Sequence, residues 1–188
     1  MEHFYNKPHM GEDWFTYADL YKAMVNKFPT GSRFVELGCW KGKSAAFMAV
    51  EILNSSKQIY FDCIDSWPDS ACEHDTLSNA KTGQELYDIF MTNISPVLPL
   101  INIRRMDSSS ASNFYWNESV DFVFVDADHT YEGVKKDIMS WWPKIKKGGV
   151  LAGHDYAWHD HIQRAVNELF GDMNHADPWG CGCFYIKK

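Results

Sequence analysis

Five short apolar runs, separated by stretches with helical periodicity, constrain the fold of this chain more than any other feature. They cover residues 34–37, 59–64, 100–106, 120–125 and 150–152. Strands that alternate with helices predict a parallel sheet with helices on both faces. A helix is expected over 159–170, and the run at 183–186 follows it without another helix between. We therefore expect the last strand to be antiparallel and to close one edge of the sheet.

Two helical patterns are the clearest. Over residues 13–28 the apolar side chains recur near helical spacing, and Pro29-Thr30-Gly31 ends the pattern. A second pattern runs through Val134, Ile138, Trp141 and Ile145 and ends at residues 146–149, Lys-Lys-Gly-Gly. A chain of 188 residues suffices for one core. We expect a single domain over 1–188, with an N-terminal helical segment at 1–30.

Composition excludes several classes of protein. The net charge is −7 and no basic stripe occurs, so we expect no nucleic-acid partner. No apolar run approaches the roughly 18 residues of a membrane span, so no membrane partner is expected. Five irregularly spaced cysteines favour a reduced, cytoplasmic protein. The Cys181-Gly182-Cys183 pair lacks the usual metal-site spacing, and we expect it to be buried and structural.

A glycine-rich turn follows the first strand. Val35-Glu36-Leu37-Gly38 leads through Gly42 to Ser44, which opens the next helix. Gly38 permits a backbone conformation that other residues avoid, and we expect Gly42 to allow close packing of the helix on the strand. The helix N-terminus then offers amide donors to a ligand. Such a turn is a weak signal by itself, because many nucleotide-binding folds contain one.

Polar residues end all five strands. They are Glu36 and Gly38, Asp65-Ser66-Trp67, Asp107-Ser108, Asp126-Ala127-Asp128-His129 and Gly153-His154-Asp155-Tyr156. Open parallel sheets bind ligands at this edge. Asp65 can accept both hydroxyls of a ribose, Asp107 and Ser108 can hold an adenine amino group, and Trp67 can stack on the ring. A turn or helix cap is the alternative for each residue alone, whereas five together favour a site.

The chain resembles the class I S-adenosylmethionine-dependent methyltransferases, most closely the branch called methyltransferase domain 24. The resemblance rests on the glycine turn, on residues 124–138 with Asp126-Ala127-Asp128-His129, and on residues 148–156. It implies a three-layer Rossmann-like α/β fold, with helices on both faces of a seven-stranded, mostly parallel sheet whose last strand is reversed. It also implies S-adenosylmethionine as the cofactor. The expected cofactor contacts are Glu36, Gly38, Trp40, Ser44, Asp65, Ser66, Trp67, Asp107, Ser108 and Asp126.

Methyl transfer requires alignment of the acceptor and removal of its proton. His129 is our candidate general base for a hydroxyl acceptor; bracing of the following helix is the alternative. The expected acceptor is a small polar molecule such as a sugar. The resemblance implies a divalent metal, magnesium or manganese, at Asp126, His154 and Asp155. Magnesium prefers oxygen ligands, so His154 weakens that ion and leaves manganese, zinc or no metal open.

Other features leave alternatives open. His159 to His161 fit a solvated first helical turn better than a zinc site, and Tyr131, Tyr156 and Trp158 either wall an acceptor pocket or pack in the core. The polar segment 66–83 is expected to be an active-site loop. A nicotinamide-dependent oxidoreductase is a rival, although G-x-G-x-x-G is absent. A catalytically inactive cofactor-binding module is another rival. Glycoside hydrolysis by paired carboxylates has little support. Whether the protein forms a homo-oligomer stays open.

Overall fold

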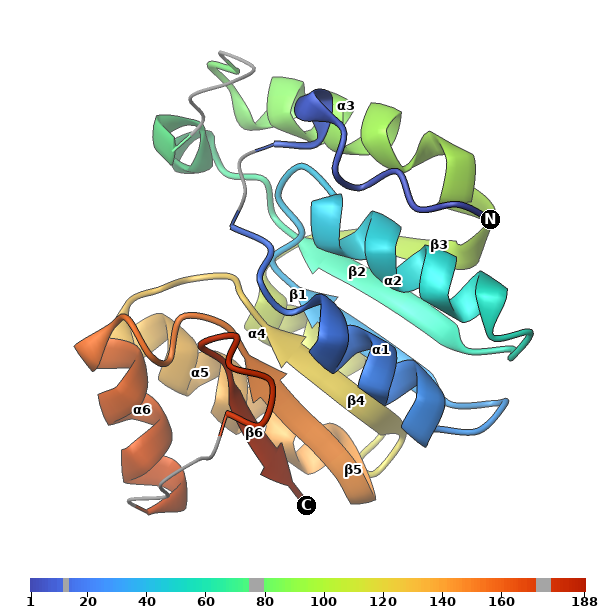
Figure 1. Cartoon of the computed structure of the whole chain (residues 1–188). Helices are drawn as coiled ribbons and strands as arrows, with labels where there is room; N and C mark the ends of the chain where they lie inside the picture. Colours follow the sequence, from blue (N-terminus) through green and yellow to red (C-terminus); the bar gives the residue numbers. More distant parts are fainter. Residues whose placement is uncertain (12–13, 75–79, 172–176) are drawn as a thin grey trace.

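The protein forms one mixed sheet in a computed structural model that describes residues 1–11, 14–74, 80–171 and 177–188. In this part of the chain the sheet has six strands, in the order β3-β2-β1-β4-β5-β6 (Figure 1). All neighbouring strands are parallel except β5 and β6, which are antiparallel. The strands are β1 (Arg33–Leu37), β2 (Tyr60–Asp65), β3 (Ile101–Arg105), β4 (Val120–Val125), β5 (Ile145–Gly153) and β6 (Phe184–Lys187).

Helices cover both faces of the sheet and make three layers (Figure 1). One face carries α1 (Ala18–Lys27), α2 (Lys43–Asn54) and α3 (Gly83–Ile94); the other carries α4 (Ser108–Ala111), α5 (Tyr131–Trp141) and α6 (Asp160–Phe170). Short 3-10 turns are η1 (Pro8–Met10), η2 (Asp69–His74), η3 (Ser95–Leu100), η4 (Ser112–Phe114) and η5 (Trp142–Lys144).

Alternation of side chains along the central strands creates two cores. Phe34 and Phe124 pack in the cluster under α1, α2 and α3, whereas Val35 and Val125 belong to the cluster under α5 and α6. Successive residues of a strand point to opposite faces, so β1 and β4 fill both layers. The predicted three-layer α/β fold and the reversed last strand are therefore confirmed.

The predicted number of strands is wrong: the described residues form six strands, not seven. The sequence itself contains six apolar runs, and the seventh strand came only from the family resemblance. The last strand, β6, pairs directly with β5, from Gly153 opposite Phe184 to Val150 opposite Lys187. In the described part of the chain, no further strand lies between β5 and β6.

Two predicted helix limits are also wrong. The helical pattern through Ile145 ends earlier, at Trp141, because Pro143 cannot continue the backbone ladder and forms the 3-10 turn η5. Ile145 then opens β5, which continues through the residues predicted to follow the helix. At the other end of the chain, α1 begins at Ala18 and not at residue 13, which lies outside the described residues.

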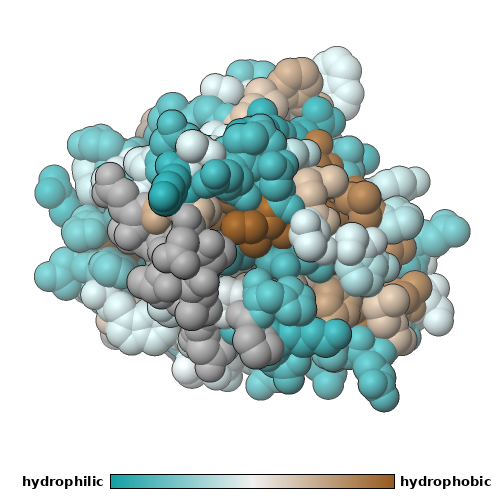
Figure 2. Space-filling view, turned by 90° about the horizontal axis from the view of Figure 1, so that it is seen from above, coloured by the Kyte–Doolittle hydropathy of each residue, from teal (hydrophilic) through white to brown (hydrophobic). Residues whose placement is uncertain are grey.

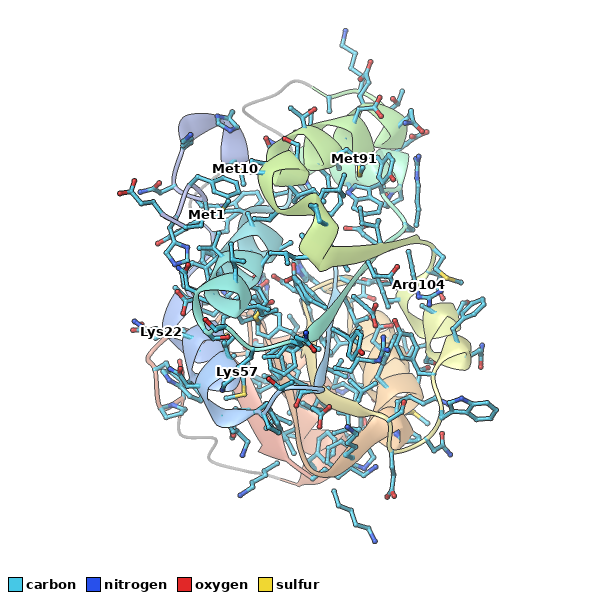
Figure 3. All side chains as sticks on the ribbon, turned by 90° about the vertical axis from the view of Figure 1, so that its right-hand side faces the viewer. Met1, Met10, Lys22, Lys57, Met91 and Arg104 are labelled. Carbon is cyan, nitrogen blue, oxygen red and sulfur yellow. The ribbon has the colours of Figure 1, made fainter. Side chains whose placement is uncertain are left out.

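Lys57 holds the C-terminal end of α1. Its ammonium donates hydrogen bonds to the carbonyls of Val25, Asn26 and Phe28, at 2.6, 2.9 and 2.8 Å. Figure 3 labels Lys57 beside α1. Carbonyls in the last turn of a helix lack partners within the helix, and a cation there also complements the helix dipole. This contact fixes α1 against the chain that follows α2.

The outer surface is mostly hydrophilic on the face that Figure 2 shows, with hydrophobic residues in small patches. Small apolar patches are usual on folded proteins. Among the described residues, every helix is too short or too polar to cross a membrane.

Candidate cofactor and catalytic site

The carboxyl ends of the strands are aligned at one edge of the sheet. Backbone hydrogen bonds continue past the strands: the Gly38 amide donates to the Ile64 carbonyl, and the Asp126 amide donates to the Leu37 carbonyl, both at 2.8 Å. The strand order reverses between β1 and β4: β2 and β3 lie on one side of β1, and β4, β5 and β6 lie on the other. Ligands of open α/β sheets bind at such a switch point.

Gly38 is required by close backbone contact. Its φ is +83°, and a Cβ added there would lie 2.0 Å from the Asp126 carbonyl oxygen. Gly42 also has a positive φ, but its neighbours differ from the prediction. An added Cβ would meet Ile94 and Phe90 of α3 at 2.7 and 3.0 Å, so the glycine allows approach of α3.

Asp65 braces the glycine turn. Its Oδ2 accepts the backbone amides of Cys39 and Trp40 at 2.8 and 2.9 Å, and its Oδ1 accepts the Trp67 amide at 2.7 Å. Burial raises the pKa of Asp65, against the lowering effect of these amides. Each carboxylate oxygen still has acceptor capacity, so bracing the turn is compatible with the predicted ribose contact.

Glu36 lies near the carboxyl end of β1, and its side chain is buried. Its two oxygens accept hydrogen bonds from the Ser44 hydroxyl at 2.7 Å and from the Tyr21 hydroxyl at 3.0 Å. Burial raises the pKa of Glu36 to about 8, although both hydroxyls oppose the shift. Glu36 therefore links α1, β1 and the first turn of α2.

The prediction that Trp67 stacks on a ligand ring is not supported by its position. The side chain is only 2% exposed, and its ring packs against Tyr87 and Phe90 of α3. Its indole nitrogen donates to the Trp40 carbonyl at 2.8 Å. Trp67 is thus part of the core, because α3 covers the aromatic residue that follows β2. Ser66, next to it, is exposed.

Trp40 is half-buried in the glycine turn and has a positive φ of 42°. Its ring stacks on the exposed Trp14, with ring centroids 4.9 Å apart. The Lys41 ammonium lies 4.4 Å from the centroid of the Trp40 ring. An aromatic pair therefore borders the predicted cofactor site, and Trp14 was not predicted from the sequence.

Asp107 and Ser108 start α4 after β3. The Oδ1 atom of Asp107 accepts hydrogen bonds from the hydroxyls of Ser109 and Ser110, which lower the pKa of Asp107 to about 2. It also caps the Ser110 amide. The Ser108 hydroxyl donates to Asp137 of α5 at 2.5 Å. Both residues reach the predicted edge; Asp107 has the helix-cap role that the alternative described, whereas Ser108 ties α4 to α5.

Three predicted metal ligands meet after β4 and β5. One ligand atom from each of Asp126, His154 and Asp155 lies within 4.8 Å of the others. The His154 Nδ1 is 3.2 Å from Asp155 Oδ1 and 3.8 Å from Asp126 Oδ1. Asp155 has a positive φ of 62°, an uncommon conformation outside glycine. The geometry brings together the three residues that the family resemblance indicated.

His129 joins this cluster from the loop before α5. Its Nε2 is 3.4 Å from Asp126 Oδ1 and 3.4 Å from Asp155 Oδ2, and its side chain is 50% exposed. The Asp126 hydrogen bond raises the pKa of His129. Burial opposes the same shift at His154, but the contacts with Asp155 and Asp126 prevail and raise its pKa. His129 is thus the exposed imidazole of the cluster.

The neighbouring predicted residues divide into two groups. Trp158 is 55% exposed, and its ring meets His154 edge-on at 5.3 Å. Tyr131 and Tyr156 instead bond to α6, through Glu168 and Asn167. His159 is at the N-cap position of α6 but makes no side-chain cap bond, and the exposed His161 lies in the first turn, as expected. Of segment 66–83, η2 packs near the start of α3, and residues 75–79 lie outside the described residues.

Residues before β1 complete the site and were missed by the sequence analysis. The hydroxyl of Tyr17 donates to Asp126 Oδ2 at 2.9 Å, and Thr16 Oγ1 lies 3.0 Å from His154 Nε2. Tyr21 bonds to Glu36. No local motif marks these residues, because their partners follow much later in the chain.

The family model of methyltransferase domain 24 matches residues 35–156 of the 188 residues in this chain. This range contains the glycine turn, Asp65, His129 and the carboxylate–histidine cluster. The chain belongs to this family of class I S-adenosylmethionine-dependent methyltransferases. The predicted family is therefore confirmed. The candidate site lies within the residues that the family model matches.

Curated relatives are much longer than the matched part of this methyltransferase domain. The uncharacterized protein y4gI of Sinorhizobium fredii is 26% identical over 129 residues, which cover 69% of this chain and 14% of y4gI. The uncharacterized protein R132 of Acanthamoeba polyphaga mimivirus is 32% identical over 57 residues, 29% of this chain and 26% of R132. The chain thus spans a minor part of both relatives.

Solved structures share the fold of the methyltransferase domain at low identity. The O-methyltransferase NovP has a TM-score of 0.66 at 16% identity, over 92% of this chain and 79% of NovP. CalS11, a TDP-rhamnose 3'-O-methyltransferase, has 0.60 at 12%, over 96% and 81%. Fibrillarin of Aeropyrum pernix, solved with S-adenosylmethionine, has 0.53 at 15%, over 92% and 76%.

Proposed function

We propose that this chain transfers the methyl group of S-adenosylmethionine to a hydroxyl oxygen of a small polar acceptor, such as a sugar. The observation that carries the proposal is the exposed imidazole of His129 beside Asp126 and Asp155, at the edge that also holds the glycine turn. NovP and CalS11, which share the fold of this chain, are both O-methyltransferases, and this supports an oxygen acceptor.

The cofactor fits the residues at the ends of β1, β2 and β3. S-adenosylmethionine supplies a methyl group on a sulfonium, which is already a strong electrophile. Gly38 lets the turn pack against the backbone at the end of β4, Asp65 offers acceptor oxygens to the ribose, and Glu36 bonds to Ser44 in the first turn of α2. Asp107 keeps a carboxylate at the end of β3 for the adenine amino group.

His129 is the proposed general base. As the acceptor oxygen bonds to the methyl carbon, the carbon–sulfur bond breaks with its electron pair on sulfur, and the hydroxyl proton passes to a nitrogen of His129. The products are the methyl ether and S-adenosylhomocysteine. Asp126 and Asp155 stabilise the imidazolium that forms, because each has an oxygen 3.4 Å from Nε2.

A divalent cation fits the donor set of Asp126, His154 and Asp155, two carboxylates and one imidazole within 4.8 Å of one another. A cation held there would supply Lewis-acid stabilisation of the acceptor oxygen. The imidazole makes magnesium the less suitable ion and favours manganese or another transition metal. If a chelator changed neither turnover nor thermal stability, the metal-assisted form of the proposal would fail.

Calorimetric titration with S-adenosylmethionine, with NAD as the control ligand, tests the cofactor. We expect roughly micromolar affinity, on the order of −8 kcal/mol, and its collapse in Asp65→Ala. Asp88→Ala is the matched control, because Asp88 is exposed on α3 and distant from the turn along the chain. Binding of NAD in place of S-adenosylmethionine would overturn the methyltransferase proposal.

An inactive cofactor-binding module is the alternative outcome. Such a module would bind S-adenosylmethionine but methylate no member of a panel of sugars, catechols and amines, in the presence or absence of manganese. Turnover of any hydroxyl compound that depends on His129 would support the proposed enzyme instead.

A further inference from the structure

Two consecutive residues before α1 contact two of the three proposed cation ligands. Thr16 Oγ1 lies 3.0 Å from His154 Nε2, and the Tyr17 hydroxyl lies 2.9 Å from Asp126 Oδ2. We propose that Thr16 and Tyr17 are positioning residues that turn His154 Nδ1 and Asp126 Oδ1 toward a divalent transition-metal ion. This inference rests on the cation site of the proposed function and deepens it.

The Thr16 hydroxyl fixes the tautomer of His154. Thr16 Oγ1 donates its single proton to the Cys181 carbonyl, at 2.9 Å. A carbonyl can only accept, so Thr16 must accept from His154, and Nε2 carries the hydrogen. The lone pair of a neutral His154 is then on Nδ1. Nδ1 faces Asp155 Oδ1 at 3.2 Å and Asp126 Oδ1 at 3.8 Å.

Tyr17 acts in the same way on Asp126. Its hydroxyl occupies Oδ2 and leaves Oδ1 as the oxygen nearest to both His129 and His154. The Tyr17 ring is buried and packs on Phe124 of β4, with ring centroids 4.4 Å apart. This packing fixes the position of the hydroxyl. Asp126 therefore presents one defined oxygen to the centre of the cluster.

A lone pair that faces two carboxylates is favourable only if a positive charge lies between them. A proton can supply that charge, and so can a metal ion bound by Nδ1, Asp126 Oδ1 and an Asp155 oxygen. A nitrogen ligand in the set favours manganese, cobalt or zinc over magnesium. Partners that orient metal ligands in this way commonly change metal affinity by about 10–100-fold.

Manganese and cobalt titrations of the purified chain test the inference without a turnover assay. We expect Thr16→Val and Tyr17→Phe each to weaken binding about 10–100-fold. Thr16→Ser keeps the hydroxyl and should retain wild-type affinity. Thr30→Val makes the same change as Thr16→Val beyond the other end of α1 and is the matched control. His154→Gln gives the background from other histidines and cysteines, and thermal unfolding verifies the fold of each variant.

The outcomes separate the inference from the function on which it rests. Wild-type binding that Thr16→Val and Tyr17→Phe leave unchanged would overturn the positioning role alone. Magnesium binding as tight as manganese binding would overturn the choice of ion. Absence of any cation binding, with S-adenosylmethionine binding intact, would overturn both the cation site and this inference but leave the methyltransferase proposal standing.

Discussion

The Tyr21 hydroxyl donates a hydrogen bond to Glu36 Oε2 at 3.0 Å, and both residues are buried. Burial raises the pKa of Glu36 from 4.5 to about 8. Below pH 4.5 the carboxyl is protonated in the folded and unfolded chains alike. Between pH 4.5 and about 8 only the unfolded chain loses the proton, so the free energy of unfolding falls as pH rises.

Glu36→Gln removes this titration. We expect the variant to gain stability relative to the wild type as pH rises from 5 toward 8, by at most about 4 kcal/mol. Its affinity for S-adenosylmethionine should fall, because the Glu36 side chain holds the Tyr21 and Ser44 hydroxyls next to the glycine turn. Urea unfolding at several pH values measures the first effect and calorimetry the second. A stability difference that did not change with pH would contradict the raised pKa.

His129→Ala should reduce kcat by about 10²–10⁴-fold and leave the affinity for S-adenosylmethionine unchanged. The reason is that His129 contacts Asp126 and Asp155 after β4 and β5, apart from the turn after β1. His161→Ala, an exposed histidine in the first turn of α6, is the control and should retain turnover. Full activity of His129→Ala would leave His129 only the bracing role.

Local sequence was sufficient to predict the strands and the residues that follow them. Apolar runs identify β1, β2 and β4, and a parallel sheet necessarily brings their carboxyl ends to one edge. The strand ends therefore predicted that Asp126, His154 and Asp155 lie at one edge, and the family resemblance grouped them as cation ligands. The end of α5 at Trp141 could also have been predicted from the sequence, because Pro143 marks it, although the helical pattern was extended to Ile145.

Contacts between distant segments could not be predicted in this way. Thr16 and His154 are 138 positions apart, and nothing near Thr16 indicates its partner. For Trp67 the local sequence fitted two interpretations, because an aromatic residue after a strand suits both a ligand site and a core. The packing of α3 over the ring decided between them, and this depends on the whole fold.

Lys57→Met should destabilise the protein by about 1–3 kcal/mol, because three carbonyls at the end of α1 lose a charged donor. Methionine keeps most of the side-chain stem, so the change reports mainly on the ammonium. Lys22→Met, an exposed lysine on α1, is the control (Figure 3). Urea midpoints of the two variants give the comparison, and equal midpoints would show that Lys57 contributes nothing specific.

Gly38→Ala and Gly31→Ala separate the two costs of replacing a glycine. Both positions have a positive φ, +83° and +89°, so alanine strains each backbone by about 1–2 kcal/mol. At Gly31 the added Cβ meets no atom within 4 Å, whereas at Gly38 it lies 2.0 Å from the Asp126 carbonyl oxygen. A backbone oxygen cannot move aside without shifting the strand end that carries Asp126. We therefore expect Gly31→Ala to fold and bind S-adenosylmethionine, and Gly38→Ala to lose at least twice as much stability and its cofactor affinity. Equal losses of stability in the two variants, measured by urea unfolding, would mean that the turn and the end of β4 are less closely packed than this contact requires.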